Sequence, residues 1–233
     1  MFDLCIDLPQ LRTYRKVLVV AGGRSVIKYY DEICERMCTE PDTALFDTNQ
    51  HFIYPEANFE RLMRSQQVKI TFALDFDLDM SRNTHSRADA IQELTASTEK
   101  WLTLPESYFA WNNAGPRRNP NEAFKTKVDE SKLISFRGVS WDHFVRTPGS
   151  LRGGLTIAPA ICAVPEHCRM EIYGADLIIT EGSRHAMEGV NPRYGKEQDA
   201  QTKIKVTHGA REKISPIVNY FAEEMGRRVS VHV

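Results

Sequence analysis

Short apolar runs alternate with helically spaced stretches along the first third of the chain. Residues 16–21 (KVLVVA) form a β-branched run that ends at two glycines, which predicts a strand buried on both faces. Helical spacing follows from Ser25, the expected N-cap, to about Cys38. Its apolar positions are Ile27, Tyr30, Ile33 and Met37. A strand over 44–46, a helix over 57–66 and a strand over 68–74 then complete a β-α-β-α-β series, which predicts a doubly wound, mostly parallel α/β sheet.

The middle of the chain lacks such a regular pattern. A helix is predicted over 88–102, but the segment from about 79 to 150 is otherwise polar and aromatic, and rich in Asn, Pro and Gly. Long irregular segments in compact proteins usually serve function, and the aromatic content argues against disorder. We therefore predict one domain over residues 1–233, with an inserted lid at about 79–150.

Regular patterns return after residue 150. Two glycines open a predicted helix that runs to residue 163, and a buried strand is predicted over 169–176. A helix over 213–225 then precedes a last strand over 229–233. These elements extend the same α/β alternation toward the C-terminal end of the sequence.

Composition narrows the class of protein. Hydrophobic residues make up 42% and charged residues 26% of the 233, which are ordinary values for a globular domain. The 30 basic residues are balanced by 31 acidic ones, which disfavours a long nucleic acid as partner. A modified nucleobase stays open as the acceptor of a transferred group. No apolar run is long enough to span a membrane and no secretory signal is recognisable, so we expect a cytoplasmic protein of a bacterium or a virus-infected cell. The five cysteines lack paired CxxC spacing, which favours reduced thiols over a metal site.

Two glycines and a serine follow the first predicted strand. Gly22 and Gly23 would let the backbone approach a ligand closely, and the helix expected from Ser25 would offer free N–H groups and the positive end of its dipole. These features favour a phosphate or a nucleotide. A tight turn between strand and helix accounts for the same residues without any ligand.

Polar residues also follow the second predicted strand. Residues 47–51 are DTNQH, and side chains at the carboxyl end of a parallel strand point into the crevice where such sheets bind ligands. The amides of Asn49 and Gln50 suit the recognition of a base or a sugar through paired donors and acceptors. The alternative is an Asx-type turn on the surface.

Further candidates lie in the last third of the chain. Arg152 could pair with a phosphate beside the helix opened by Gly153 and Gly154. Asp176 ends a predicted strand, and His185 follows in a polar loop. Because histidine titrates near neutrality, His185 is the best candidate for a general base, the alternative being a merely solvated side chain.

Three aspartates alternate after the third predicted strand. Asp75, Asp77 and Asp79 could hold a divalent metal for a nucleotide diphosphate. Alternation with period two also places all three on one exposed face of a strand end, and this second interpretation is favoured.

The order of these motifs resembles the sialyltransferase-like superfamily. The segments are VLVVAGGRS (17–25), LFDTNQHF (45–52), RGGLTIAPAICA (152–163), EIYGADL (171–177) and SRHAMEG (183–189). They are most similar to bacterial sialyltransferases and to the related DUF115-type proteins, which include a pterin pyrophosphokinase. The resemblance implies a nucleotide-binding Rossmann-like fold of the glycosyltransferase-A-variant type with a lid. It also implies metal-independent transfer from a nucleotide sugar, commonly a CMP-activated one.

The resemblance also implies roles for individual residues. The Gly22, Gly23 and Ser25 turn would lie by the nucleotide phosphate, and Asn49 and Gln50 by the base or ribose. Beside the cytidine, Gly153 and Gly154 stand where a Ser/Thr-Gly pair is usual. His185 would deprotonate the acceptor hydroxyl.

We therefore expect a glycosyltransferase that requires no cofactor and moves a sugar from a nucleotide-sugar donor to a small-molecule or glycan hydroxyl. One alternative is a Mg²⁺-dependent pyrophosphokinase or phosphotransferase on the same scaffold, with Asp75 and Asp77 as metal ligands. Another is a nucleotide-binding module without chemistry.

Overall fold

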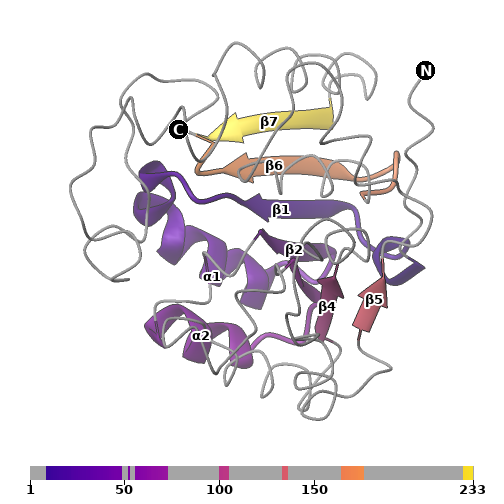
Figure 1. Ribbon diagram of the computed structural model, residues 1–233, viewed down its shortest axis with the longest axis horizontal. Coiled ribbons are helices and arrows are strands. Elements are labelled where there is room, and N and C mark those ends of the chain that lie inside the picture. The colour runs from indigo at the N-terminus through magenta and orange to yellow at the C-terminus, as the bar shows by residue number, and fades with distance from the viewer. Residues whose placement is uncertain are drawn as a thin grey trace, which may run out of the picture.

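The described residues form a sheet of seven parallel strands (Figure 1). The computed structural model describes residues 9–48, 52, 56–72, 100–104, 133–135, 164–175 and 228–232. The strands are β1 (Lys16–Val20), β2 (Thr43–Thr48), β3 (Lys69–Phe72), β4 (Lys100–Leu104), β5 (Leu133–Ser135), β6 (Arg169–Tyr173) and β7 (Val229–His232). Parallel strands with helices between them confirm the α/β class predicted from the sequence.

The strand order contains one reversal. Along the sheet the order is β5-β4-β3-β2-β1-β6-β7, so the chain moves outward from β1 to β5 and then returns to the other side of β1. β1 pairs with β2 on one side and with β6 on the other. The switch point of the sheet is therefore the boundary between β1 and β6.

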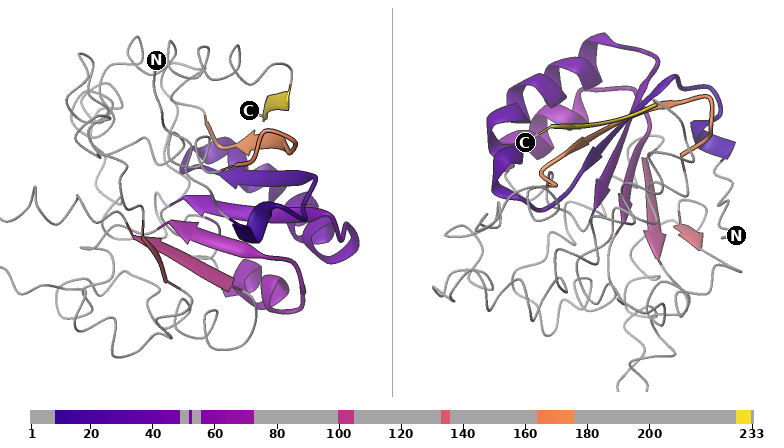
Figure 2. Two further views of the ribbon diagram at one scale, coloured as in Figure 1. Left: turned by 90° about the vertical axis from the view of Figure 1, so that its right-hand side faces the viewer. Right: turned by 90° about the horizontal axis from the view of Figure 1, so that it is seen from above.

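The helices α1 (Tyr30–Thr39) and α2 (Glu56–Met63) cover one face of the sheet (Figure 2). An ion pair between Arg61 on α2 and Asp31 on α1 joins the two helices. Two 3₁₀ helices complete the described elements, η1 (Pro9–Leu11) and η2 (Arg24–Tyr29), and η2 leads directly into α1. None of the helices in this described part of the chain is long and apolar enough to cross a membrane.

The core lies between the central strands and these helices. Val17, Leu18, Val19 and Val20 of β1 are all fully buried, as predicted for a strand covered on both faces. The largest fully buried side chains are Tyr173, Phe46, Phe52, Leu11, Leu18, Ile33, Met37 and Leu45.

The first helix differs from its prediction at its start. Ser25 is not the N-cap, because η2 begins at Arg24 and Gly23 precedes it without a side-chain cap. A 3₁₀ helix has three residues per turn, so its buried face drifts from the expected 3.6-residue phase. Consequently Val26 is buried and Ile27 is 45% exposed, whereas Ile33 on α1 is buried as expected.

The segment from 79 to 150 contributes two strands to the sheet. The helix predicted over 88–102 is wrong at residues 100–102, which belong to β4. β4 pairs with β3 and β5. This pairing with strands distant in sequence outweighs the local preference for a helix that the spacing of apolar residues indicated. The other residues of this segment, which make up the rest of the predicted lid, lie outside the described part. The helices predicted over 153–163 and 213–225 lie outside it as well.

Candidate functional site

The turn after β1 is bonded to the end of β6. The N–H of Ala21 donates to the carbonyl of Tyr173 at 2.8 Å, and the N–H of Gly23 donates to the carbonyl of Gly174 at 2.7 Å. Parallel sheets bind ligands outside the carboxyl ends of their strands at the switch point. This turn therefore occupies the position where a ligand of such a sheet is expected.

Gly174 fits this position because it carries no side chain. Its φ is +73°, in the left-handed region that favours glycine. An added Cβ would lie 2.6 Å from the carbonyl oxygen of Ala21 and 3.0 Å from both Gly23 O and Val26 Cβ. Gly23, by contrast, has an extended backbone with φ −73° and ψ 149°. The position that requires a glycine is thus Gly174 and not Gly23. Sequence reasoning did not select Gly174 as a site residue, although a glycine directly after a buried strand was a signal for such a requirement.

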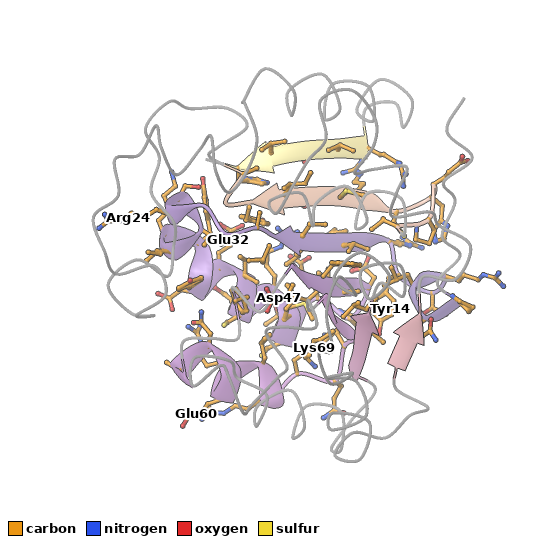
Figure 3. The ribbon with its side chains drawn as sticks, viewed as in Figure 1. Tyr14, Arg24, Glu32, Asp47, Glu60 and Lys69 are labelled. Atoms are coloured by element: carbon orange, nitrogen blue, oxygen red, sulfur yellow. The ribbon has the colours of Figure 1, made fainter. Side chains whose placement is uncertain are left out.

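The same bonds limit what the turn can offer to an anion. The N–H of Gly23 is engaged by Gly174, and the N–H of Val26 donates to the carbonyl of Gly23 at 3.2 Å. The N–H of Gly23 is therefore not available to donate a hydrogen bond to a ligand beside this turn. Gly22 and Ser25 are half-buried and Arg24 is exposed. Figure 3 shows Arg24 at the periphery, beyond the end of β1.

The carboxyl end of β2 holds a buried carboxylate. Asp47 is fully buried (Figure 3), and its Oδ1 accepts the N–H of Phe52 at 3.0 Å. Asn58 on α2 donates its amide to the carbonyl of Phe52 at 3.1 Å. Burial and the charge of Asp47 raise the pKa of Tyr30 above its usual range. Asp47 therefore holds Phe52 at the end of β2 instead of facing a ligand.

A cluster of charged side chains lies between α1 and β6. The Arg36 guanidinium makes two parallel hydrogen bonds to the Glu171 carboxylate, both 2.8 Å long. It also donates to Tyr173 Oη at 2.7 Å and to Glu40 at 3.2 Å. The side chains of Arg36 and Glu171 are only 14% and 19% exposed, so this pair is shielded from water.

His232 joins this cluster from the end of β7. Its Nε2 lies 3.1 Å from Glu171 Oε2, and its ring stacks on Tyr173 at 4.4 Å with an angle of 7°. The Tyr29 ring meets both of these rings edge-on. The hydroxyl of Tyr173 lies within hydrogen-bonding distance of Glu171 at 3.1 Å and Glu32 at 3.2 Å.

The protonation states of the cluster follow from these contacts. The hydrogen bonds from Arg36 lower the pKa of Glu171 to about 2 despite its burial. Burial and the Glu171 charge raise the pKa of Tyr173 above its usual range. At neutral pH the cluster therefore contains an ionised carboxylate and a protonated phenol.

The sheet register places this cluster beside the switch point. Tyr173 is aligned with Val20 of β1 on one side and with His232 on the other. Neighbouring strands lie about 4.8 Å apart, so the His232 backbone is roughly 10 Å from the end of β1. Sequence reasoning missed this histidine, although Glu171 between the buried Met170 and Ile172 was a signal that a polar partner exists.

Three of the predicted site residues lie within the described part of the chain. Gly22, Gly23 and Ser25 lie at the switch point, as the prediction of a turn between strand and helix requires. The candidates outside the described residues are Asn49, Gln50, Asp75, Asp77, Asp79, Arg152, Gly153, Gly154, Asp176 and His185.

The described residues include three cysteines but no cluster of metal ligands. Within the described ranges, no group of three or more His, Cys, Asp or Glu side chains is arranged to hold a metal ion. Cys34, Cys38 and Cys168 are free thiols. Burial is the main cause that raises the pKa of Cys34 to about 11, so this thiol stays protonated and packs as an apolar group.

The chain was compared with known proteins at three levels. No protein-family model matches it, and neither a curated protein nor a solved structure was found to match. The strand order and the side chains around the switch point are therefore the features of this chain that indicate a function.

Proposed function

We propose that the protein binds a nucleotide over the carboxyl ends of β1 and β6 and transfers a sugar from a nucleotide-sugar donor to a hydroxyl acceptor. The observation that carries the proposal is the strand order, because it creates a switch point at the turn that contains Gly22 and Gly23. In this proposal the sheet belongs to a doubly wound, Rossmann-like fold of the glycosyltransferase-A-variant type.

The surroundings of the turn support an anionic ligand. Arg24 and Lys28 are exposed on η2, and no acidic residue occurs in this helix. A phosphate beside the turn would gain attraction from these cations. The absence of a side chain at Gly22 would also let a ligand approach the backbone closely.

The remaining roles follow the superfamily resemblance. Asn49 and Gln50 would contact the base or ribose. Gly153 and Gly154 would allow close approach to a cytidine. Independently of the resemblance, Arg152 would pair with the phosphate, and Asp176 follows β6 in the sequence. His185 is the base that the resemblance suggests. The reaction proposed here requires no metal.

A thermal-shift panel tests the proposal. CMP, CDP, UDP, GDP, ADP and ATP are each added with and without Mg²⁺, and a ligand at 100 times its dissociation constant should stabilise the fold by about 2.7 kcal/mol. We expect stabilisation by CMP, or by another nucleotide of sugar donors, without metal. A shift only with ATP and Mg²⁺ would favour phosphotransfer through Asp75 and Asp77. No shift with any of them would refute the nucleotide site.

A matched pair of variants locates the ligand. Arg24→Ala removes a cation next to the turn, and Arg64→Ala removes an exposed cation just after α2. We expect the Arg24 variant to weaken nucleotide binding about ten- to a hundredfold, because one charged hydrogen bond to phosphate is lost. Equal affinities in the two variants would place the ligand elsewhere.

A further inference from the structure

His232 has the arrangement of a histidine held for proton transfer. One ring nitrogen, Nε2, bonds to the Glu171 carboxylate at 3.1 Å. The other nitrogen, Nδ1, has no hydrogen-bond partner among the residues that the structure describes, and the side chain is 31% exposed. A carboxylate on one nitrogen fixes the tautomer and leaves the lone pair of the other available to a substrate.

The orientation of the ring is fixed from several sides. Stacking on the buried Tyr173 sets its plane, and the edge of Tyr29 limits its rotation. Glu171 is in turn held by two hydrogen bonds from Arg36. A general base needs such preorganisation, because it must meet the acceptor proton at hydrogen-bonding distance.

We propose that His232 is the general base of the transfer reaction, which makes this inference dependent on the proposed nucleotide-sugar function. In the reaction, Nδ1 takes the proton of the acceptor hydroxyl while its oxygen forms a bond to the anomeric carbon. The bond from that carbon to the phosphate oxygen breaks, and its electron pair leaves with the nucleotide. Glu171 then stabilises the imidazolium that results.

The two groups of the cluster that lie nearest to His232, Glu171 and Tyr173, are unsuited to this task. The Glu171 carboxylate is occupied by Arg36, Tyr173 and His232 itself, and its low pKa makes it a poor proton acceptor. Tyr173 is fully buried. Glu171 is therefore a positioning residue, and the half-exposed imidazole is the group that a substrate can reach.

The position of His232 suits a sugar attached to a phosphate at the turn. It lies at the level of the last residue of β1, two strands away across β6, which is roughly 10 Å. A phosphate at the turn and a sugar extending over β6 would bring the anomeric carbon toward β7. The base of the nucleotide would then extend the other way, toward the loop after β2.

The test compares two histidine variants of the full chain. His232→Gln retains a side-chain amide that can donate to Glu171 but cannot accept the acceptor proton and become a cation. His167→Gln is the control, because His167 is exposed and contacts the carbonyl of Tyr14 just before the amino end of β1. For each we would measure nucleotide affinity by calorimetry and nucleotide release from CMP-activated and other nucleotide sugars, with His185→Ala alongside.

We expect His232→Gln to lower kcat about 10²–10⁴-fold with the nucleotide Kd unchanged, and His167→Gln to alter neither. A kcat within threefold of wild type would overturn the proposal for His232, especially if His185→Ala abolishes turnover. Nucleotide binding by the wild type without turnover of any donor would also overturn it, but would leave the nucleotide site standing. Failure of the wild type to bind any nucleotide would instead refute the proposed function.

A second measurement does not require turnover. The ¹⁵N chemical shifts of the His232 ring, assigned by comparison with His232→Gln, distinguish the two neutral tautomers. We expect the proton on Nε2, where Glu171 accepts it. A proton on Nδ1 would overturn the proposal, because this nitrogen could then accept nothing.

Discussion

Replacing Gly174 by alanine would introduce a methyl group at the point where β6 meets the turn after β1. The new Cβ would lie 2.6 Å from the carbonyl oxygen of Ala21, inside the contact distance that real Cβ atoms keep. The neighbours at this point include two backbone oxygens, which cannot rotate away as a side chain would. The turn would have to move, and the bonds from the Ala21 and Gly23 N–H groups to β6 would lengthen.

The cost has two parts. An alanine held at φ +73° loses roughly 1–2 kcal/mol relative to glycine. Overpacking of a tight contact adds about 1–3 kcal/mol, so the total is about 2–5 kcal/mol. Because domains are stable by only about 5–15 kcal/mol, this variant should unfold at a clearly lower urea concentration.

Gly23→Ala is the matched control for this experiment. Gly23 has φ −73° and ψ 149°, which alanine adopts without strain. Urea unfolding followed by circular dichroism should therefore rank the Gly174 variant well below the Gly23 variant. The reasoning would be refuted if Gly174→Ala lost less than about 1 kcal/mol, or if the two variants were equally destabilised.

Two further predictions concern carboxylates. The pKa of Glu171 falls from 4.5 to about 2 on folding, so its stabilising contribution is present above pH 4.5 and is lost as the pH falls toward 2. Between pH 5 and pH 2.5 the wild type should therefore lose about 2 kcal/mol more than Glu171→Gln, and parallel curves in urea titrations at each pH would contradict this. Asp47→Ala leaves the buried Phe52 N–H without its acceptor and should cost about 1–3 kcal/mol, whereas Asp47→Asn keeps an oxygen there and should cost less. The measurement is again urea unfolding, and equal losses would show that the hydrogen bond to Phe52 is not what matters.

Much of the sheet could be predicted because its central strands are apolar on both faces. Residues 16–21 and the two glycines after them predict β1, since such an apolar run is stable only when both faces are covered. β4 was missed because its pairing with β3 and β5 decides its conformation. The start of η2 was misplaced because its 3₁₀ geometry changes the phase of the apolar pattern.

The candidate site was less predictable, since its contacts join distant parts of the chain. Arg36 and Glu171 are 135 residues apart, and Glu171 and His232 are 61 apart. The sequence shows each residue type but not which strands become neighbours. Gly22 and Gly23 were found because a turn is a local feature, whereas the demand for glycine at Gly174 arises from Ala21 and Val26 across the switch point.

The position of the switch point has a consequence for the order of assembly. β1 meets β2 through residues 27 apart in sequence, Lys16 and Thr43, but it meets β6 through Lys16 and Arg169, which are 153 apart. Closing the longer loop costs about 1.5 kcal/mol more chain entropy, from the logarithm of that ratio. Contacts of such large separation form late in folding. The turn at Gly22 and its partner Gly174 are therefore brought together only when the last third of the chain joins the first, so the switch point, where we propose that the nucleotide binds, is among the last features to be completed.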